Sequence, residues 1–117
     1  MKLLNSLVKR VTAIAALSLV LFVSAASAAA IQLNGEGCMA YAVWSRDIIW
    51  AREVGADKDK VRVSLIEMAD TDESGVLRLV LREFENLWNT YAERGVVGNW
   101  VFRDCLARRG RYNEVQL

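Results

Sequence analysis

Residues 38–54 read CMAYAVWSRDIIWAREV, and this stretch decides the fold. Its apolar residues recur at the three- and four-residue spacing of one helical stripe, at Tyr41, Trp44, Ile48 and Ala51. Gly55 follows, and glycine is the residue that most readily ends a helix. We therefore predict a helix over these residues that ends at Gly55.

The same segment carries a second apolar set on another side of the predicted helix, at Met39, Val43, Trp50 and Val54. The helix is thus apolar around more than half of its girth. Either it is the central helix of the fold, or it presents an apolar surface to a partner. In the second case the candidate partner surface is formed by Met39, Val43 and Trp50.

Helical spacing continues toward the C-terminus. A charged turn predicts an N-cap at Asp57 and a second helix that runs to about Ala69. Further apolar stripes predict a third helix over 76–94 and a fourth over 100–109, joined by a connector at 95–99.

The fold class follows from these segments. The chain has no proline, and no segment alternates in the manner of a strand. We predict an all-α domain, a small antiparallel bundle of about four helices with loose ends at 29–37 and 111–117.

The N-terminus has the pattern of a secretory signal peptide over residues 1–28. A short positive region precedes an apolar run at 11–23, and Ala26-Ser27-Ala28 forms an A-x-A cleavage site. Cleavage after Ala30 fits as well. We therefore expect an exported, periplasmic or secreted protein with one helical domain at 29–117. The alternative is an uncleaved membrane anchor, the only case in which we expect a membrane contact.

Removal of this segment changes the charge. The whole chain has 15 basic and 14 acidic residues, and Lys2, Lys9 and Arg10 leave with the signal. The mature domain would then carry 12 basic residues against 14 acidic ones, a net charge of −2. This balance does not favour nucleic acid as a partner.

Cys38 and Cys105 are the only cysteines. An even cysteine count in a small exported chain predicts a disulfide, which here would tie the first helix to the last. Closing so long a loop stabilises a domain by about 4 kcal/mol in the chain-entropy model. The alternatives are an intermolecular bridge and a reactive thiol pair, although a C-x-x-C spacing is missing.

The composition does not favour an enzyme, because the chain has no histidine. That removes the usual general base and the commonest metal ligand. If the cysteines are paired, no thiol nucleophile remains. We therefore expect neither an enzyme nor a cofactor.

One segment resembles half of a metal-binding loop. Residues 70–75 read DTDESG, like the start of an EF-hand calcium loop, in which Asp70, Asp72 and Ser74 would offer oxygen ligands. The twelfth position, which should be glutamate, is Leu81. The favoured interpretation is a helix–helix turn in which Asp70 or Asp72 caps a helix.

Four tryptophans complete the set of informative residues: Trp44, Trp50, Trp88 and Trp100. Trp44 and Trp88 lie on predicted apolar stripes and are expected in the core. For Trp50 and Trp100 we expect that the bundle covers them as well. If they are exposed instead, they mark a partner or ligand surface.

We therefore expect an exported helical protein that acts by non-catalytic binding of an envelope or extracellular protein. Its size and architecture are loosely similar to those of the periplasmic acid-stress chaperones, and this resemblance implies the first alternative, a chaperone that exposes apolar surface in acid. The second alternative is a calcium-dependent module that uses the Asp70–Gly75 turn.

Overall fold

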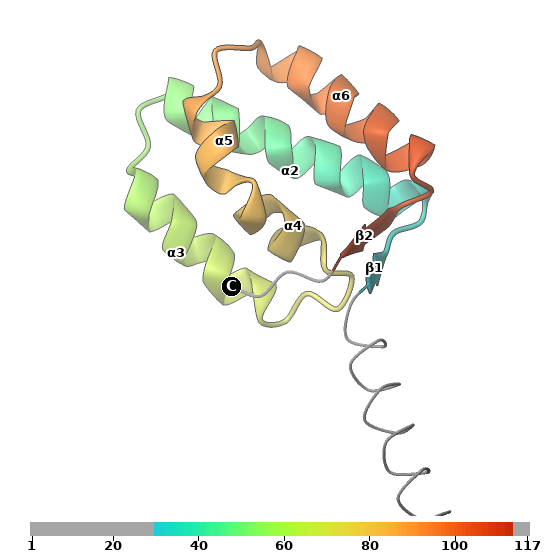
Figure 1. Cartoon of the computed structure of the whole chain (residues 1–117). Helices are drawn as coiled ribbons and strands as arrows, with labels where there is room; N and C mark the ends of the chain where they lie inside the picture. Colours follow the sequence, from blue (N-terminus) through green and yellow to red (C-terminus); the bar gives the residue numbers. More distant parts are fainter. Residues whose placement is uncertain (1–29, 114–117) are drawn as a thin grey trace, which may run out of the picture. The chain divides into compact units, whose positions relative to one another are not determined.

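The structure, a computed structural model, describes residues 30–113 (Figure 1). The predicted signal peptide and the end of the C-terminal tail lie outside these residues. The described part contains five helices and two short strands: β1 (Ala30–Gln32), α2 (Gly35–Glu53), α3 (Lys58–Ala69), α4 (Val76–Arg82), α5 (Phe84–Asn89), α6 (Arg94–Ala107) and β2 (Arg111–Asn113). The mostly helical fold is confirmed, with one more helix than predicted and a small two-stranded sheet that was not predicted.

The helix that decides the fold begins earlier than its apolar stripe. The Asn34 side chain accepts a hydrogen bond from the Gly37 backbone nitrogen at 2.8 Å, so α2 begins at Gly35 rather than at Cys38. At the other end Gly55 has a φ of 79°, the left-handed conformation that favours glycine after a helix. The predicted stop at Gly55 is confirmed.

The second predicted helix is also confirmed. The Asp57 side chain accepts a hydrogen bond from the Lys60 backbone nitrogen at 3.0 Å and caps α3. An ion pair of 2.7 Å between Lys58 and Glu85 ties the start of α3 to α5, and the hydrogen bond from Lys58 lowers the pKa of Glu85.

The predicted third helix is divided and shorter. It breaks at Glu83 into α4 and α5, and α5 ends at Asn89 instead of near Arg94. The Arg52 guanidinium donates hydrogen bonds to the carbonyl oxygens of Trp88 and Thr90, which satisfies backbone groups where the helix stops. Tyr91, which falls within the predicted helix, lies beyond the end of α5 and is fully exposed.

The predicted connector at 95–99 is wrong, because these residues belong to the first half of α6. A Cβ on Gly98 would lie 3.7 Å from the Ala42 carbonyl oxygen and 3.8 Å from the Arg46 Cβ. An added Cβ would therefore be in ordinary van der Waals contact with α2, so Gly98 lies at the α2–α6 interface. The two glycines that indicated a loop are therefore both helical. Gly98 lies where α6 packs on α2, and Gly95 is tolerated within the helix.

The expected loose ends instead contain the two strands. The Leu33 nitrogen donates to the Gly110 carbonyl oxygen at 2.9 Å, beside the pair β1–β2. Gly110 has a φ of 70°, and a Cβ there would overlap the Leu33 carbonyl. Ile31, Leu33 and Tyr112 are buried, so the pair is part of the core.

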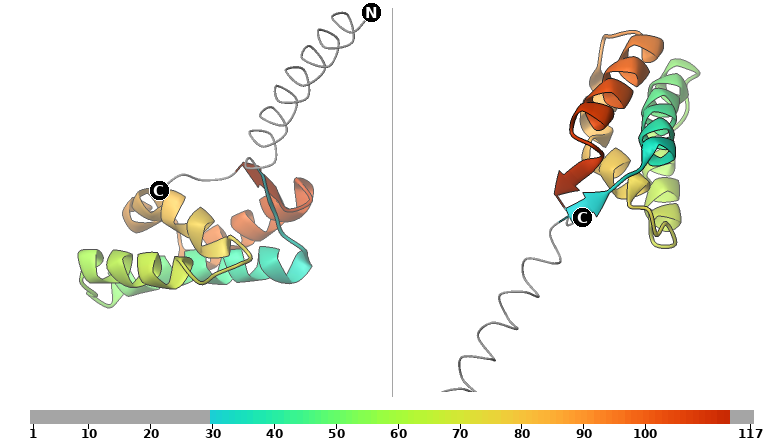
Figure 2. Two further views of the ribbon diagram at one scale, coloured as in Figure 1. Left: turned by 90° about the horizontal axis from the view of Figure 1, so that it is seen from below. Right: turned by 90° about the vertical axis from the view of Figure 1, so that its right-hand side faces the viewer.

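Helices α2 and α6 lie side by side (Figures 1 and 2). The Cys38–Cys105 disulfide joins the first turn of α2 to the last turn of α6, which confirms the predicted bridge. An ion pair of 3.6 Å between Glu53 and Arg94 joins their opposite ends, so the two helices are antiparallel. The disulfide is typical of proteins that fold outside the cytoplasm.

The core lies where α4 and α5 pack against α2. Its fully buried side chains include Ile49, Leu79, Val80 and Phe84. Helix α3 packs on α4 on the far side from α6. None of the helices within residues 30–113 is both long and apolar enough to cross a bilayer.

Candidate functional site: a groove between α2 and α3

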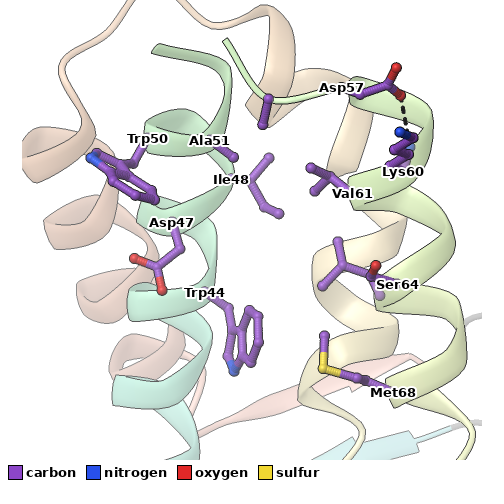
Figure 3. Close-up of a pocket in the computed structure, with 12 residues that line it drawn as sticks. Trp44, Asp47, Ile48, Trp50, Ala51, Asp57, Lys60, Val61, Ser64 and Met68 are labelled. Carbon is purple, nitrogen blue, oxygen red and sulfur yellow. Dashed lines mark hydrogen bonds between the residues drawn. The ribbon is translucent and has the colours of Figure 1, made fainter. Parts of the chain in front are cut away.

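An open groove of about 470 Å³ separates α2 from α3 (Figure 3). It exists because α3 packs on α4, and α2 packs on α4, α5 and α6, while α2 and α3 do not close on each other. The sharp turn at Gly55 and the Asp57 cap direct α3 away from α2. The chain reversal that joins the two helices therefore creates the groove.

Apolar side chains of the two helices face each other across this groove. Trp44 and Ile48 project from α2, and Val61 and Met68 project from α3 toward them (Figure 3). Leu65 is buried and forms part of the groove floor. An indole wall opposite a flexible thioether suits an apolar guest of irregular shape.

Polar groups lie at the rim of the groove: Asp47, Asp57, Lys60 and Ser64. One oxygen of Asp57 is occupied by the helix cap. The remaining groups can orient a guest by hydrogen bonds or charge, while the apolar walls supply most of the contact area.

Trp44 was expected in the core, and the structure places it between core and groove. It is partly buried against the core cluster, and its remaining surface lines the groove. Trp88 is partly buried and stacks on Phe84 with 5.7 Å between ring centroids.

The expected burial of Trp50 and Trp100 is wrong, because their exposed fractions are 49% and 60%. Trp50 lies at the edge of the groove, on the outer side of α2 (Figure 3). It also borders a more polar hollow beside α6, lined by Arg46, Glu93 and Arg94 among others. Trp50 thus stands on the ridge between two concave surfaces.

The structure divides the predicted partner surface into two parts. Met39 and Val43 lie beside Phe102 of α6 in a shallow hollow of about 100 Å³. Trp50 lies further along the helix and does not line this hollow. Arg46, which borders the hollows on both sides, separates the two parts.

The Asp70–Gly75 turn is held by hydrogen bonds within the turn and to α4. Asp72 accepts from the Ser74 nitrogen at 3.1 Å, the Ser74 hydroxyl at 2.6 Å and the Leu77 nitrogen at 2.9 Å. Partial burial opposes ionisation of Asp72, but these hydrogen bonds outweigh it and lower the pKa of the carboxyl. Within residues 30–113, no three His, Cys, Asp or Glu side chains gather in a metal-binding group.

Sequence reasoning missed the α3 wall of the groove. Val61, Leu65 and Met68 share one face of α3, yet Met68 is 40% exposed and Val61 is only partly buried. The sequence did carry one indication of an open groove: the apolar face of α3 has only three residues. A helix with so few apolar positions on its inner face cannot cover all of α2.

The chain combines one disulfide, an antiparallel α2–α6 pair and an apolar groove. No protein family, curated protein or solved structure matches this chain.

Proposed function

We propose that this chain is an exported, non-catalytic binding protein, which holds an amphipathic helix of a partner protein in the α2–α3 groove. The observation that carries the proposal is the open apolar groove between two helices that do not close on each other. Residues 1–28 would direct export to the periplasm or the exterior, where the Cys38–Cys105 bridge is stable.

The shape of the groove favours a helix as its occupant. Its α3 wall runs from Asp57 to Met68, about 16 Å at the helical rise, or three turns. A third helix laid between two others buries apolar residues at three- and four-residue spacing in such a groove. The partner segment would therefore carry apolar residues at that spacing over about three turns.

The chemistry of the walls favours recognition by contact. Trp44, Ile48, Val61 and Met68 offer apolar area, and the polar groups lie at the rim. Trp50, half exposed at the edge, is the residue type that most often contributes strongly to protein interfaces.

Site-specific photo-crosslinking in the native envelope tests the proposal. Ser64 and Val63 are adjacent on α3 and both exposed, but only Ser64 lines the groove. A benzophenone side chain at Ser64 should capture a discrete partner through an amphipathic helical segment. The same group at Val63 is the matched control and should not.

Substitution at the groove edge gives a second measurement. Trp50→Ala should weaken binding of the captured partner at least about tenfold, as for an interface tryptophan, with an unchanged melting temperature. The matched control is Trp100→Ala, which removes another largely exposed indole away from the groove. Equal capture from Ser64 and Val63, or capture through an extended polar segment, would overturn the proposal.

A second candidate function, an acid-stress chaperone, is favoured by one observation. The carboxylate of Asp72 holds the start of α4, against which the groove wall α3 packs. Protonation of this carboxylate in acid would weaken the cap and widen the apolar groove. Binding of an environment-sensitive apolar dye, measured from pH 7 to pH 3, should rise for this function and stay constant without it.

A further inference from the structure

A second cleft lies over α2, between α5 and α6. Its volume is about 350 Å³, within the range of small-ligand sites, and it shares no lining residue with the α2–α3 groove. The α2 side chains that form its floor, Tyr41 and Ser45, are buried. The cleft is therefore a concave surface separate from the groove, and the proposed partner helix does not occupy it.

The floor of the cleft contains two polar side chains, Ser45 and Tyr41. The hydroxyl of Ser45 already has a hydrogen-bond partner. The Ser45 hydroxyl donates to the Tyr41 carbonyl oxygen at 2.7 Å. Burial raises the pKa of the Tyr41 phenol to about 12, and Glu83 adds to the rise, so the hydroxyl stays protonated at neutral pH. Buried Leu87 and Val97 complete the lower walls with apolar surface.

The rim of the cleft carries balanced charge. Arg82 lies 3.3 Å from Glu83 on the α4–α5 side, and Arg108 lies 3.3 Å from Asp104 on the α6 side. Two ion pairs therefore lie at the rim, one on each side of the opening. An anionic guest would meet Glu83 and Asp104, and a cationic guest would meet both arginines, so neither charge is favoured.

Trp100 lines the same cleft from α6, with 60% of its surface exposed. An indole held at the rim of a cleft offers a flat apolar face for stacking. Burial in the core does not explain its position, because the buried side of α6 is formed by Val97 and Cys105. Trp100 is available to a guest in the cleft.

Tyr112 supplies an unpartnered polar atom at the end of the cleft. Its hydroxyl is buried and has no hydrogen-bond partner, although the residue lines the cleft. The Arg108 guanidinium lies over its ring, 4.5 Å from the centroid, and is held by an exposed ion pair. A guest in the cleft that reached this hydroxyl would supply its missing hydrogen-bond partner, and leaving such a group unpaired is costly.

We propose that the cleft between α5 and α6 binds a neutral saccharide, stacked on Trp100 and hydrogen-bonded by the rim pairs Arg82–Glu83 and Asp104–Arg108. A sugar ring has an apolar C–H face for the indole. Its hydroxyls both donate and accept, so they match arginine donors and carboxylate acceptors in equal measure. This class of ligand is the one that a charge-balanced cleft with an exposed indole favours.

NMR titration of the isotope-labelled, oxidised protein tests the proposal. The probes are two neutral trisaccharides, chitotriose and maltotriose, and an acidic one, trigalacturonate. At least one neutral sugar should shift the Trp100 indole N–H signal together with amide signals of α5 and α6, with saturable binding. The Trp50 indole signal should not move.

Three variants complete the test. Trp100→Ala should weaken binding at least about tenfold through loss of stacking, and Trp50→Ala should leave it unchanged. Tyr112→Phe should weaken binding by roughly two- to tenfold, the effect of one hydrogen bond, while it raises the melting temperature by removing an unsatisfied hydroxyl.

Three results would overturn the proposal: no shifts with either neutral sugar, binding of the uronate alone, or equal loss of binding in Trp50→Ala and Trp100→Ala. None of these results bears on the α2–α3 groove, so this inference and the proposed function can fail independently.

Discussion

The two flanks of α2 differ in how they are closed. On the α6 flank the Cys38–Cys105 disulfide, the Glu53–Arg94 ion pair and the contact at Gly98 hold two antiparallel helices together. On the α3 flank the two helices diverge from the turn at Gly55, and an apolar groove remains between them.

The difference shows how one helix can be both structural and available for binding. A helix that is apolar around more than half of its girth needs more cover than a small domain provides. The chain concentrates its covalent and close-packed contacts on one flank, and this leaves apolar surface open on the other.

Removing the bridge should break the closed flank. The double variant Cys38→Ala, Cys105→Ala loses the constraint on a loop with a sequence separation of 67 residues. By the chain-entropy model it should lose about 4 kcal/mol of unfolding free energy, measured by urea denaturation. Reduced wild-type protein is the control and should match the variant. A loss below about 1 kcal/mol would contradict a structural role.

Truncating the groove floor should loosen α3 selectively. Leu65 is buried between α3 and the core, so Leu65→Ala should cost about 2 to 4 kcal/mol of unfolding free energy. Hydrogen exchange should rise in α3 more than in α2 or α6. Met68→Ala, at the exposed groove wall, is the comparison and should cost much less. Uniformly raised exchange in all helices would show that the flanks are not independent.

Two substitutions of Gly98 test the close approach of α6 to α2. A Cβ fits there at ordinary contact distance, so Gly98→Ala should stabilise the helix by about 0.5 to 1 kcal/mol. Gly98→Leu should push the helices apart and cost about 1 to 3 kcal/mol. Thermal melts measure both. Equal effects of the same sign would contradict the packing role of this glycine.

Loss of the Asp72 cap should have a pH-dependent effect. The pKa of Asp72 is lowered by folding, so its contribution is present above the unfolded pKa and is lost as the pH falls through the folded value. Asp72→Asn should therefore lose about 1 kcal/mol at pH 7 and differ little from the wild type in strong acid. Urea denaturation at both pH values measures the difference. A deficit that grows in acid would contradict the cap.

The exposed tryptophans should contribute least to stability. Trp50→Ala and Trp100→Ala each remove an indole that is about half exposed or more, so each should change the unfolding free energy by roughly 0.5 kcal/mol or less. Melting curves of the two variants should overlay the wild-type curve. A large loss in either would place that indole in the structural core and remove it as a binding residue.

The helices with strong apolar periodicity could be predicted from the sequence. The stripe at Tyr41 and Ile48, the Asp57 cap and the single possible cysteine pairing each depend on local pattern or count, and the structure confirms them. Gly55 was correctly identified as a helix stop because its left-handed conformation is a property of the residue itself.

Features that depend on tertiary contact could not be predicted. Gly95 and Gly98 resemble loop residues, yet both lie in α6, and at Gly98 this helix packs against α2. The end of α5 depends on Arg52, which is distant in sequence. The strand pair is three residues on each side, too short for alternation to be visible.

The candidate site was predictable only in part. Trp50 was named as a partner residue, and it lies at the groove edge. Met39 and Val43 lie in a different hollow, because they face α6 while the groove lies on the α3 side of α2. The position of the groove depends on the direction that α3 takes after Gly55. The local sequence pattern does not predict that direction.

The placement of the bridge has a mechanical consequence. Tension applied at residues 30 and 113 would first separate β1 from β2 and then act on the sulfur–sulfur bond. The chain between Cys38 and Cys105 would therefore carry no tension. Only two short arms could be drawn out, about 50 Å in all, whereas the reduced chain could yield roughly 230 Å more. An oxidised molecule pulled by its ends would thus keep the α2–α3 groove assembled, whereas the cleft between α5 and α6 would lose Tyr112, which lies outside the bridge.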